Sequence, residues 1–218
     1  MKSKPIVVEF WGELACFSAP YARVERLSYP APTPTAAIGM LSAIYAKPAE
    51  FCWEIEKIEI LNPIKYLSIQ RNETKEKLSS RTLEPIDMSE TRTQRQTIAM
   101  KNPRYRITAH IVPRKGQEGR LDKLVEQAER RIKTGQCYYQ PSMGLREFPG
   151  YFELSDGKRN PIPVDIDMGF VVHDLWNIDD WEPKDNYPVK RTMFHCFANQ
   201  GVINVPERGS REIIRGGE

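Results

Sequence analysis

The 218-residue sequence has no long apolar run of the kind that crosses a membrane. A helix that spans a bilayer needs roughly 20 consecutive apolar residues, and no stretch of this chain approaches that length. The apolar segment Pro5–Phe10 is short and is interrupted by Glu9, whereas a secretory signal has a longer uninterrupted apolar centre. We therefore expect a cytoplasmic protein that does not contact a membrane.

Cysteine and histidine are few and far apart. The cysteines are Cys16, Cys52, Cys137 and Cys196, and the histidines are His110, His173 and His195. A zinc site uses ligands paired at short spacing, as in CxxC or HxxxH, and neither pattern occurs. Scattered cysteines in a reducing compartment are typically unpaired core residues. The sequence therefore predicts no metal site and no cofactor.

The composition is that of a globular protein, with 40% hydrophobic and 10% aromatic residues. This content excludes an intrinsically disordered chain, because enough apolar surface is available to form a core. The length allows one large domain or a main domain with a smaller one.

Charge is unevenly distributed, although the total is only +3. Residues 92–115 contain no acid, and their bases are Arg92, Arg95, Lys101, Arg104, Arg106, Arg114 and Lys115. Residues 151–187 contain nine acids against three bases, a net charge of −6. A local basic surface attracts phosphate whatever the overall charge of the protein. We therefore expect a basic surface formed by residues 92–115 and an acidic region near residues 151–187.

Periodicity predicts an alternation of strands and helices. Apolar runs or alternating patterns indicate strands at 5–10, 53–61 and 104–112. Helices are expected at 35–46, with Thr33 as N-cap and Pro34 at the first position, and at 121–132, ending near Gly135. Residues 70–92 are polar and fit a long loop or an extended hairpin.

This order predicts an α+β fold with a ferredoxin-like β-α-β-β-α-β unit, which is also the architecture of RNA-recognition motifs. We place this domain, with its long inserted hairpin, at residues 1–150. Short strands at 169–172, 193–197 and 201–205 predict a small antiparallel β-sheet in a C-terminal domain at 151–218.

Two residues could carry chemistry. His110 alternates with the apolar positions of its strand and shares a face with Arg104 and Arg106. It is either a partly exposed sheet residue or a general acid or base beside a phosphate, since imidazole titrates near neutral pH. Tyr45 ends the first predicted helix and is either a core aromatic or a group that orients a ribose hydroxyl or stacks on a base.

A loop rich in glycine and proline follows the second predicted helix, at residues 138–150. It matches neither a GxGxxG motif nor a P-loop. Gly144 and Arg146 could bring backbone NH groups and a guanidinium close to phosphate.

Four sequence blocks resemble one protein family. WGELACFSAP, VERLSYPAPTPTAAIGMLSAIYAKP, RYRITAHIV and QPSMGLREFPGYF look like the CRISPR-associated Cas-five proteins of the type I-C (Dvulg) subtype, over about the first three-quarters of the chain. The resemblance implies a RAMP-type protein with a ferredoxin-like domain and a small C-terminal β-sheet. It implies a metal-independent endoribonuclease that cuts CRISPR precursor RNA in its repeats and then stays on the 5′ end of the guide as a Cascade subunit.

The resemblance also implies a catalytic tyrosine, lysine and histidine. The tyrosine of the IYxKP segment falls on Tyr45, and the histidine of the central strand falls on His110. No lysine stands beside His110, where the chain has Thr108 and Ala109. The positive charge could come instead from Lys47, Lys101 or Arg106.

Metal-free RNA cleavage fits these residues, because the ribose 2′-OH is itself the nucleophile. The reaction needs a base for the 2′ proton, a cation for the phosphate and an acid for the 5′ oxygen. We expect His110 as the acid or base, Tyr45 at the 2′-OH, and products with a 2′,3′-cyclic phosphate and a 5′-OH. The residues expected to bind RNA are Arg92, Arg95, Arg104, Arg114, Lys115, Gly144 and Arg146.

Two other functions are compatible with the sequence. The first is a non-catalytic Cascade subunit that grips the 5′ handle of the crRNA beside the backbone and large subunits. The second is nonspecific binding of duplex DNA through phosphate contacts. Under all three hypotheses the partners are nucleic acids, and no membrane is involved.

Overall fold

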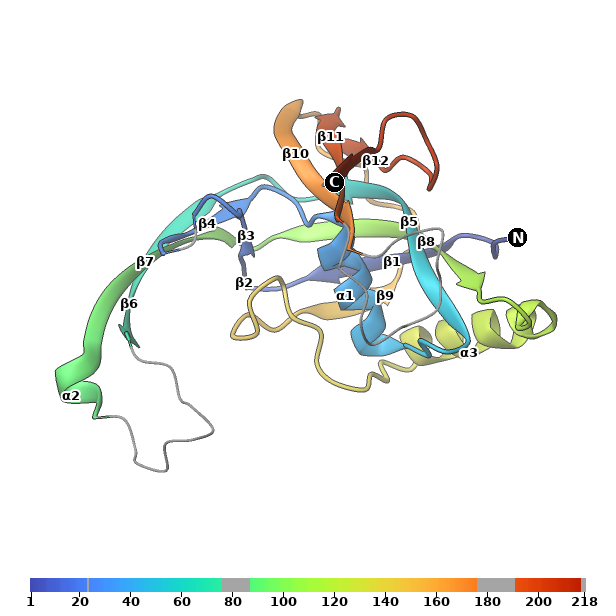
Figure 1. Ribbon diagram of the computed structural model, residues 1–218, viewed down its shortest axis with the longest axis horizontal. Helices are drawn as coiled ribbons and strands as arrows, with labels where there is room; N and C mark the ends of the chain where they lie inside the picture. The colour runs from blue at the N-terminus through green and yellow to red at the C-terminus, as the bar shows by residue number, and fades with distance from the viewer. Residues whose placement is uncertain (23, 76–86, 176–190, 217–218) are drawn as a thin grey trace.

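The computed structural model describes residues 1–22, 24–75, 87–175 and 191–216. The fold is α+β, with mostly antiparallel sheets and few helices (Figure 1). In the described part of the chain, no helix is long and apolar enough to cross a bilayer.

Two helices cover one face of the larger sheet. The first is α1 (Pro34–Ile44), in which Thr33 is the N-cap and its hydroxyl accepts a hydrogen bond from the Ala36 backbone NH at 3.3 Å, as predicted. The second is α3 (Leu121–Lys133), preceded by a 3-10 turn at Glu118–Arg120. Gly135 follows α3 with a φ of +67°, so it forms the left-handed ending that its sequence position predicted.

The helices α1 and α3 pack on the larger sheet. Its order is β10-β11-β12-β5-β8-β1-β9, with β13 (Ile214–Gly216) paired to β11. One end of this sheet is formed by β5 (Phe51–Ile60), β8 (Arg104–Pro113), β1 (Ile6–Trp11) and the edge strand β9 (Tyr151–Leu154), each antiparallel to its neighbour. When the strands of the smaller sheet are left out, these strands and the two helices follow one another along the chain as β1-α1-β5-β8-α3-β9. The fourth of these strands, β9, was not predicted, and it begins at Tyr151, beyond the residues assigned to the first domain.

The predicted hairpin is present and extends away from the rest of the molecule (Figure 1). Its strands are β6 (Tyr66–Thr74) and β7 (Arg92–Lys101), which pair antiparallel over their whole length, with α2 (Met88–Thr91) before β7. Residues 76–86, which were part of the predicted hairpin, lie outside the described residues. Near its base the hairpin joins three short strands, β2 (Leu14–Ala15), β3 (Phe17–Ser18) and β4 (Arg26–Tyr29).

The C-terminal strands do not form a small sheet of their own, which corrects the prediction. They are β10 (Ile166–Asp174), β11 (Arg191–Asn199) and β12 (Val202–Asn204). Strand β12 pairs antiparallel with β5, so the C-terminal strands continue the large sheet. Their apolar residues Val171, Phe194 and Ile203 belong to the common core. The division into domains at residue 150 stays a prediction. Four acids of the predicted acidic region, Asp179, Asp180, Glu182 and Asp185, lie outside the described residues.

Candidate functional site

The two faces of β8 differ in chemistry, as its alternating sequence predicted. Tyr105, Ile107, Ala109 and Ile111 are fully buried in the core beneath the helices. Arg104, Arg106, Thr108 and His110 occupy the opposite face. We call this opposite side of β1, β5 and β8 the polar face. It is covered rather than open, since His110 is 5% exposed and Arg106 is 7% exposed. The interpretation of His110 as a partly exposed sheet residue is therefore wrong.

His110 is held between two oxygen atoms. Its Nδ1 lies 2.8 Å from the backbone carbonyl oxygen of Ser3, and its Nε2 lies 2.5 Å from Oε2 of Glu56. Both partners can act as acceptors, so both contacts are satisfied when each ring nitrogen carries a proton. Ser3 is buried, whereas the Glu56 side chain is 50% exposed. Nε2 is therefore the nitrogen that can exchange its partner for a substrate oxygen.

Further charges surround this pair. Glu54 lies directly across the strand pair from His110, and its carboxylate is 3.6 Å from the Lys2 ammonium. The same ammonium donates to Glu207 at 2.6 Å, and this hydrogen bond lowers the pKa of Glu207. His110 is thus the centre of a cluster that also contains Glu56, Glu54, Lys2 and Glu207.

Arg106 is part of a separate buried network. Its guanidinium donates to Glu9 at 3.1 Å, to the Ser155 hydroxyl at 2.8 Å and to the Arg159 carbonyl at 2.7 Å. It also lies 3.5 Å from the Glu59 carboxylate. Each guanidinium nitrogen of Arg106 thus already has a protein partner, so these contacts do not support Arg106 as the cation for a reacting phosphate. Lys101 lies at the exposed end of β7 and is likewise not part of the His110 cluster.

Tyr45 lies in the core on the helix side of the sheet. It is 1% exposed, and its ring stacks on Phe51 with the centroids 5.2 Å apart. Burial raises the pKa of the Tyr45 phenol, against a smaller opposing effect of Lys47. The Lys47 ammonium is 3.1 Å from Glu50, and this hydrogen bond raises the pKa of Lys47. Tyr45 and Lys47 therefore form one local cluster.

The structure does not bring Tyr45 and His110 together. Phe51 and Trp53 pack on the helix side of β5 with Tyr45, and Trp53 also donates its indole NH to the Tyr45 carbonyl at 2.9 Å. His110 and its partners lie on the polar face. Because side chains of successive strand residues point to opposite faces, the sheet separates the two clusters.

The predicted basic surface is not a single surface. Strands β7 and β8 run almost end to end along the long axis, so Arg92 and Lys115 lie at opposite ends of the molecule (Figure 1). On the hairpin, Arg95 is 3.3 Å from Glu73. Arg114 and Lys115 follow the far end of β8, where the Arg114 guanidinium donates to the Pro48 carbonyl. Residues 92–115, the segment without acids, extend over two strands that belong to different sheets. The composition of the segment could not show this.

The loop at 138–150 packs against the base of the hairpin. Arg71 of β6 donates to Glu147 at 2.6 Å, and the Cys16 backbone NH donates to the Met143 carbonyl at 2.9 Å. Gly144 has a φ of +89°, and a Cβ at this position would lie 2.0 Å from the Cys16 carbonyl oxygen. Close packing therefore explains this glycine without a phosphate. Arg146 is exposed.

Sequence patterns did not indicate the partners of His110. Glu56 sits at the irregularity of β5, between Ile55 and Lys57, where the alternation slips by one residue. The break in the alternation of apolar and charged residues was visible in the sequence. The sequence did not show to which face of the sheet this break would turn the Glu56 side chain. Within the described ranges, no three His, Cys, Asp or Glu side chains gather as a metal site would require. The expectation of no metal stays a prediction.

Comparison with known proteins places the chain in a family. The family model described as CRISPR-associated protein (Cas_Cas5), of the Cas5d type, matches residues 6–218. The chain belongs to the Cas5 family. It is 35% identical over 220 residues to a Thermus thermophilus protein named CRISPR pre-crRNA endoribonuclease Cas5d, covering 95% of this chain and 94% of the relative. A Mannheimia succiniciproducens protein of the same name is 36% identical over 231 residues, covering 96% and 98%.

The fold is also similar to that of solved structures. A crystal structure of a CRISPR-associated protein superposes with a TM-score of 0.68 at 20% identity, covering 98% of both chains. A functionally uncharacterised protein from Streptococcus mutans gives a TM-score of 0.67 at 19% identity and the same coverage. At this level of identity, these likenesses concern the fold alone.

Proposed function

We propose that this protein is an endoribonuclease that cleaves CRISPR precursor RNA within its repeats without a metal. The names of the two curated relatives support the substrate and the reaction class. The observation that carries the chemistry is the position of His110, whose Nε2 faces the half-exposed carboxylate of Glu56. An imidazole in this setting can move a proton at neutral pH.

The proposed reaction needs only groups of the RNA and of the protein. A base removes the 2′ proton, the 2′ oxygen forms a bond to the adjacent phosphorus, and the bond from phosphorus to the 5′ oxygen breaks. An acid gives a proton to that 5′ oxygen. The products are a 2′,3′-cyclic phosphate and a 5′-OH, and atoms and charge balance without oxidation or reduction.

We assign the acid role to His110. The Ser3 carbonyl fixes its Nδ1, which leaves Nε2 to donate to the departing 5′ oxygen once RNA displaces Glu56. Glu56 then acts as a positioning residue that holds the orientation of the ring before RNA binds. Lys2 is the cation of this cluster, and its partly exposed ammonium can stabilise the negative charge of the phosphate once RNA displaces the exposed Glu207 carboxylate.

We assign Tyr45 a positioning role, since its ring is buried on the other side of the sheet. Its phenol interacts with Lys47, whose ammonium is held by Glu50 at 3.1 Å. Lys47 is exposed enough to contact an RNA phosphate outside the reaction centre. The tyrosine and lysine of the family resemblance thus support RNA binding, while His110 carries the proton transfer.

The finer fold assignment and the setting of the protein belong to the same proposal. The order β5-β8-β1-β9, with α1 and α3 on one face, supports a ferredoxin-like classification of this unit. We propose a cytoplasmic protein that stays on the 5′ handle of the crRNA and joins the other type I-C Cascade subunits.

A second function, a crRNA-binding subunit without cleavage activity, has one observation in its favour. Both His110 and Tyr45 are at least 95% buried, and no lysine stands beside His110. A site of this kind must open before RNA can reach Nε2. The two functions differ in what the isolated protein does to a repeat RNA.

The test uses purified protein and a labelled CRISPR repeat hairpin, with 10-fold excess protein and EDTA present. The proposal predicts cleavage at one position and a free 5′-OH on one product. The 3′ end of the other product should resist ligation until acid opens the cyclic phosphate and a phosphatase removes the resulting monophosphate. Tight binding of the hairpin without cleavage would support the binding subunit instead. Equal binding of unrelated duplex DNA that disappears at moderate salt would support nonspecific phosphate binding.

A further inference from the structure

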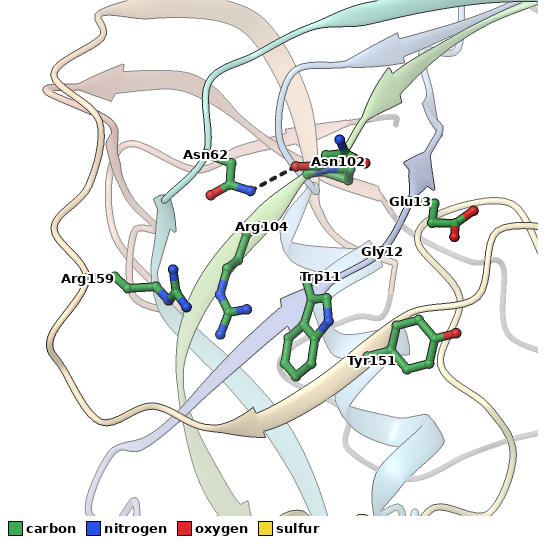
Figure 2. A pocket seen from close by; sticks show the side chains of 9 residues that line it. Trp11, Gly12, Glu13, Asn62, Asn102, Arg104, Tyr151 and Arg159 are labelled. Atoms are coloured by element: carbon green, nitrogen blue, oxygen red, sulfur yellow. Dashed lines mark hydrogen bonds between the residues drawn. The ribbon is translucent and has the colours of Figure 1, made fainter.

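A cavity of about 350 Å³ opens at the other end of the polar face, away from His110 (Figure 2). It lies where β1 and β8 meet β9, next to the turns that carry Asn62 and Asn102. Its lining residues are Trp11, Gly12, Glu13, Asn62, Asn102, Pro103, Arg104, Tyr151 and Arg159. This volume is in the range of sites that hold small ligands, and the proposed mechanism does not use it.

Three flat side chains form one wall of the cavity. Arg104, Trp11 and Tyr151 are direct neighbours across three adjacent strands. The Arg104 guanidinium lies over the Trp11 ring at 4.4 Å from its centroid, and the rings of Trp11 and Tyr151 stack with centroids 6.2 Å apart. Such surfaces on a β-sheet are what unpaired nucleobases stack on, because every base has a π-face.

The orientation of Arg104 is fixed before any ligand binds. Its guanidinium donates to Glu9 at 2.7 Å and pairs with Glu153, and its side chain is only 11% exposed. It can therefore present a flat face without losing side-chain entropy on binding. Its charge is already neutralised, so it serves as a stacking surface rather than as a phosphate contact.

Arg159 provides the most exposed positive charge of the cavity. Its side chain is 55% exposed and lies 3.5 Å from the Glu9 carboxylate, which also accepts from Arg104 and Arg106. Arg104 and Arg106 also have Glu153 and Glu59 as partners, whereas Arg159 contacts Glu9 at the edge of this network and keeps half of its side chain open to a ligand. Figure 2 shows Arg159 and Arg104 side by side, with the Asn62 amide above them donating to the Asn102 carbonyl at 2.9 Å.

We propose that this cavity binds a single unpaired nucleotide of the RNA, with its base against the Arg104–Trp11 stack and its phosphate at Arg159. This proposal rests on the proposed function. His110 and Arg104 lie on the same face of β8, six residues apart, which is about 20 Å of strand. The nucleotide in the cavity is therefore not the one that is cleaved. Its contacts contribute to the affinity of the protein for RNA without taking part in the chemical step.

The test is a set of repeat RNAs in which each carries one abasic residue, measured for affinity by fluorescence anisotropy. Wild-type protein is expected to lose about tenfold in affinity at one or two positions outside the hairpin stem. Trp11→Leu is expected to lose about tenfold for intact RNA and to show no further loss at those positions. Arg159→Ala is expected to lose severalfold in affinity, whereas Lys158→Ala, which removes a more exposed neighbouring charge paired with Asp156, is expected to change it little.

The outcomes separate the cavity from the reaction. Single-turnover cleavage at saturating protein should be unchanged in Lys158→Ala, because Lys158 neither lines the cavity nor contacts the buried network. If wild-type protein cleaves the repeat but Trp11→Leu and Arg159→Ala bind it as tightly as wild type, the cavity proposal is wrong and the proposed function stands. If wild-type protein neither binds nor cleaves repeat RNA, both fail.

Discussion

Glu9→Gln tests the buried network that holds the polar face in place. The Glu9 side chain is 2% exposed, and its carboxylate accepts hydrogen bonds from Arg104 at 2.7 Å, from Arg106 at 3.1 Å and from the Ser155 hydroxyl at 2.9 Å. Glutamine keeps the shape but removes the charge. It leaves two guanidinium groups, with side chains 11% and 8% exposed, without their main partner.

We expect Glu9→Gln to lower the free energy of unfolding strongly, because the two guanidinium charges stay buried. Removing one partner of a buried ion pair typically costs about 3–5 kcal/mol. Arg106 keeps Glu59 and Arg104 keeps Glu153, so we expect the lower end, about 3 kcal/mol. For a chain of this length that corresponds to a fall in Tm of about 6–12 °C. Chemical denaturation followed by circular dichroism at pH 7.5 measures it.

The pH dependence supplies a second readout. Burial alone would raise the pKa of Glu9, but hydrogen bonds from Arg104, Ser155 and Arg106 outweigh it, so the pKa lies below its ordinary value of 4.5. The stabilisation from Glu9 is therefore complete above about pH 4.5 and is lost as the pH falls through the lowered value. The gap between wild type and Glu9→Gln should shrink in acid.

Glu153→Gln is the matched control. It is the same chemical change on the neighbouring strand, directly opposite Glu9, and it also removes a partner of Arg104. The Glu153 side chain is 53% exposed, so its loss should cost no more than about 1 kcal/mol. A Glu9→Gln protein as stable as Glu153→Gln, or a gap that widens in acid, would refute the role given to this network.

Three other predictions concern single positions. Gly144→Ala should lower the free energy of unfolding by at least about 2 kcal/mol, because the new Cβ would collide with the Cys16 carbonyl oxygen and Gly144 has a φ of +89°. Gly39→Ala, where a Cβ enters open space on α1, should instead raise the free energy of unfolding by about 0.4–1 kcal/mol. Thermal unfolding of the two variants measures both effects. Burial raises the pKa of Cys196 to about 12, so this thiol should not react with DTNB at pH 8 in the native protein. Native wild type and native Cys196→Ser should therefore give the same number of reactive thiols. After unfolding, the variant should give one thiol fewer than wild type. Tyr45→Phe, which keeps the ring but loses the contact with Lys47, should slow cleavage by about tenfold or less through weaker RNA binding, and a loss of 100-fold or more at saturating protein would contradict its positioning role.

The local structure was predictable where a short-range rule applies. Thr33 caps α1 and Gly135 ends α3 because capping depends on neighbouring residues alone. The alternation along β8 placed Arg106 and His110 on one face for the same reason. Strand β9 escaped prediction because its YFEL sequence is too short for a periodic signal, and only its pairing with β1 defines it.

Long-range packing was not predictable in this way. The sequence pattern of β8 cannot show that the backbone of Ser3 and the segment around Ser155 cover its polar face, because those contacts join residues about 50 to 107 positions apart. The same limit explains why Tyr45 and His110 were both expected to act directly in the cleavage reaction. Each was assigned to an element correctly, but the sheet that separates them results from the whole topology.

The central claim is that His110 transfers a proton during RNA cleavage. The most direct test is single-turnover cleavage of a repeat hairpin by His110→Asn, beside His195→Asn as a matched control. His195 also faces a carboxylate, Asp167 at 3.1 Å, but it is half-exposed on β11. The account predicts at least a 100-fold slower rate for His110→Asn, with RNA affinity within about threefold of wild type, and an unchanged rate for His195→Asn. A folded His110→Asn protein that cleaves at the wild-type rate would contradict the account.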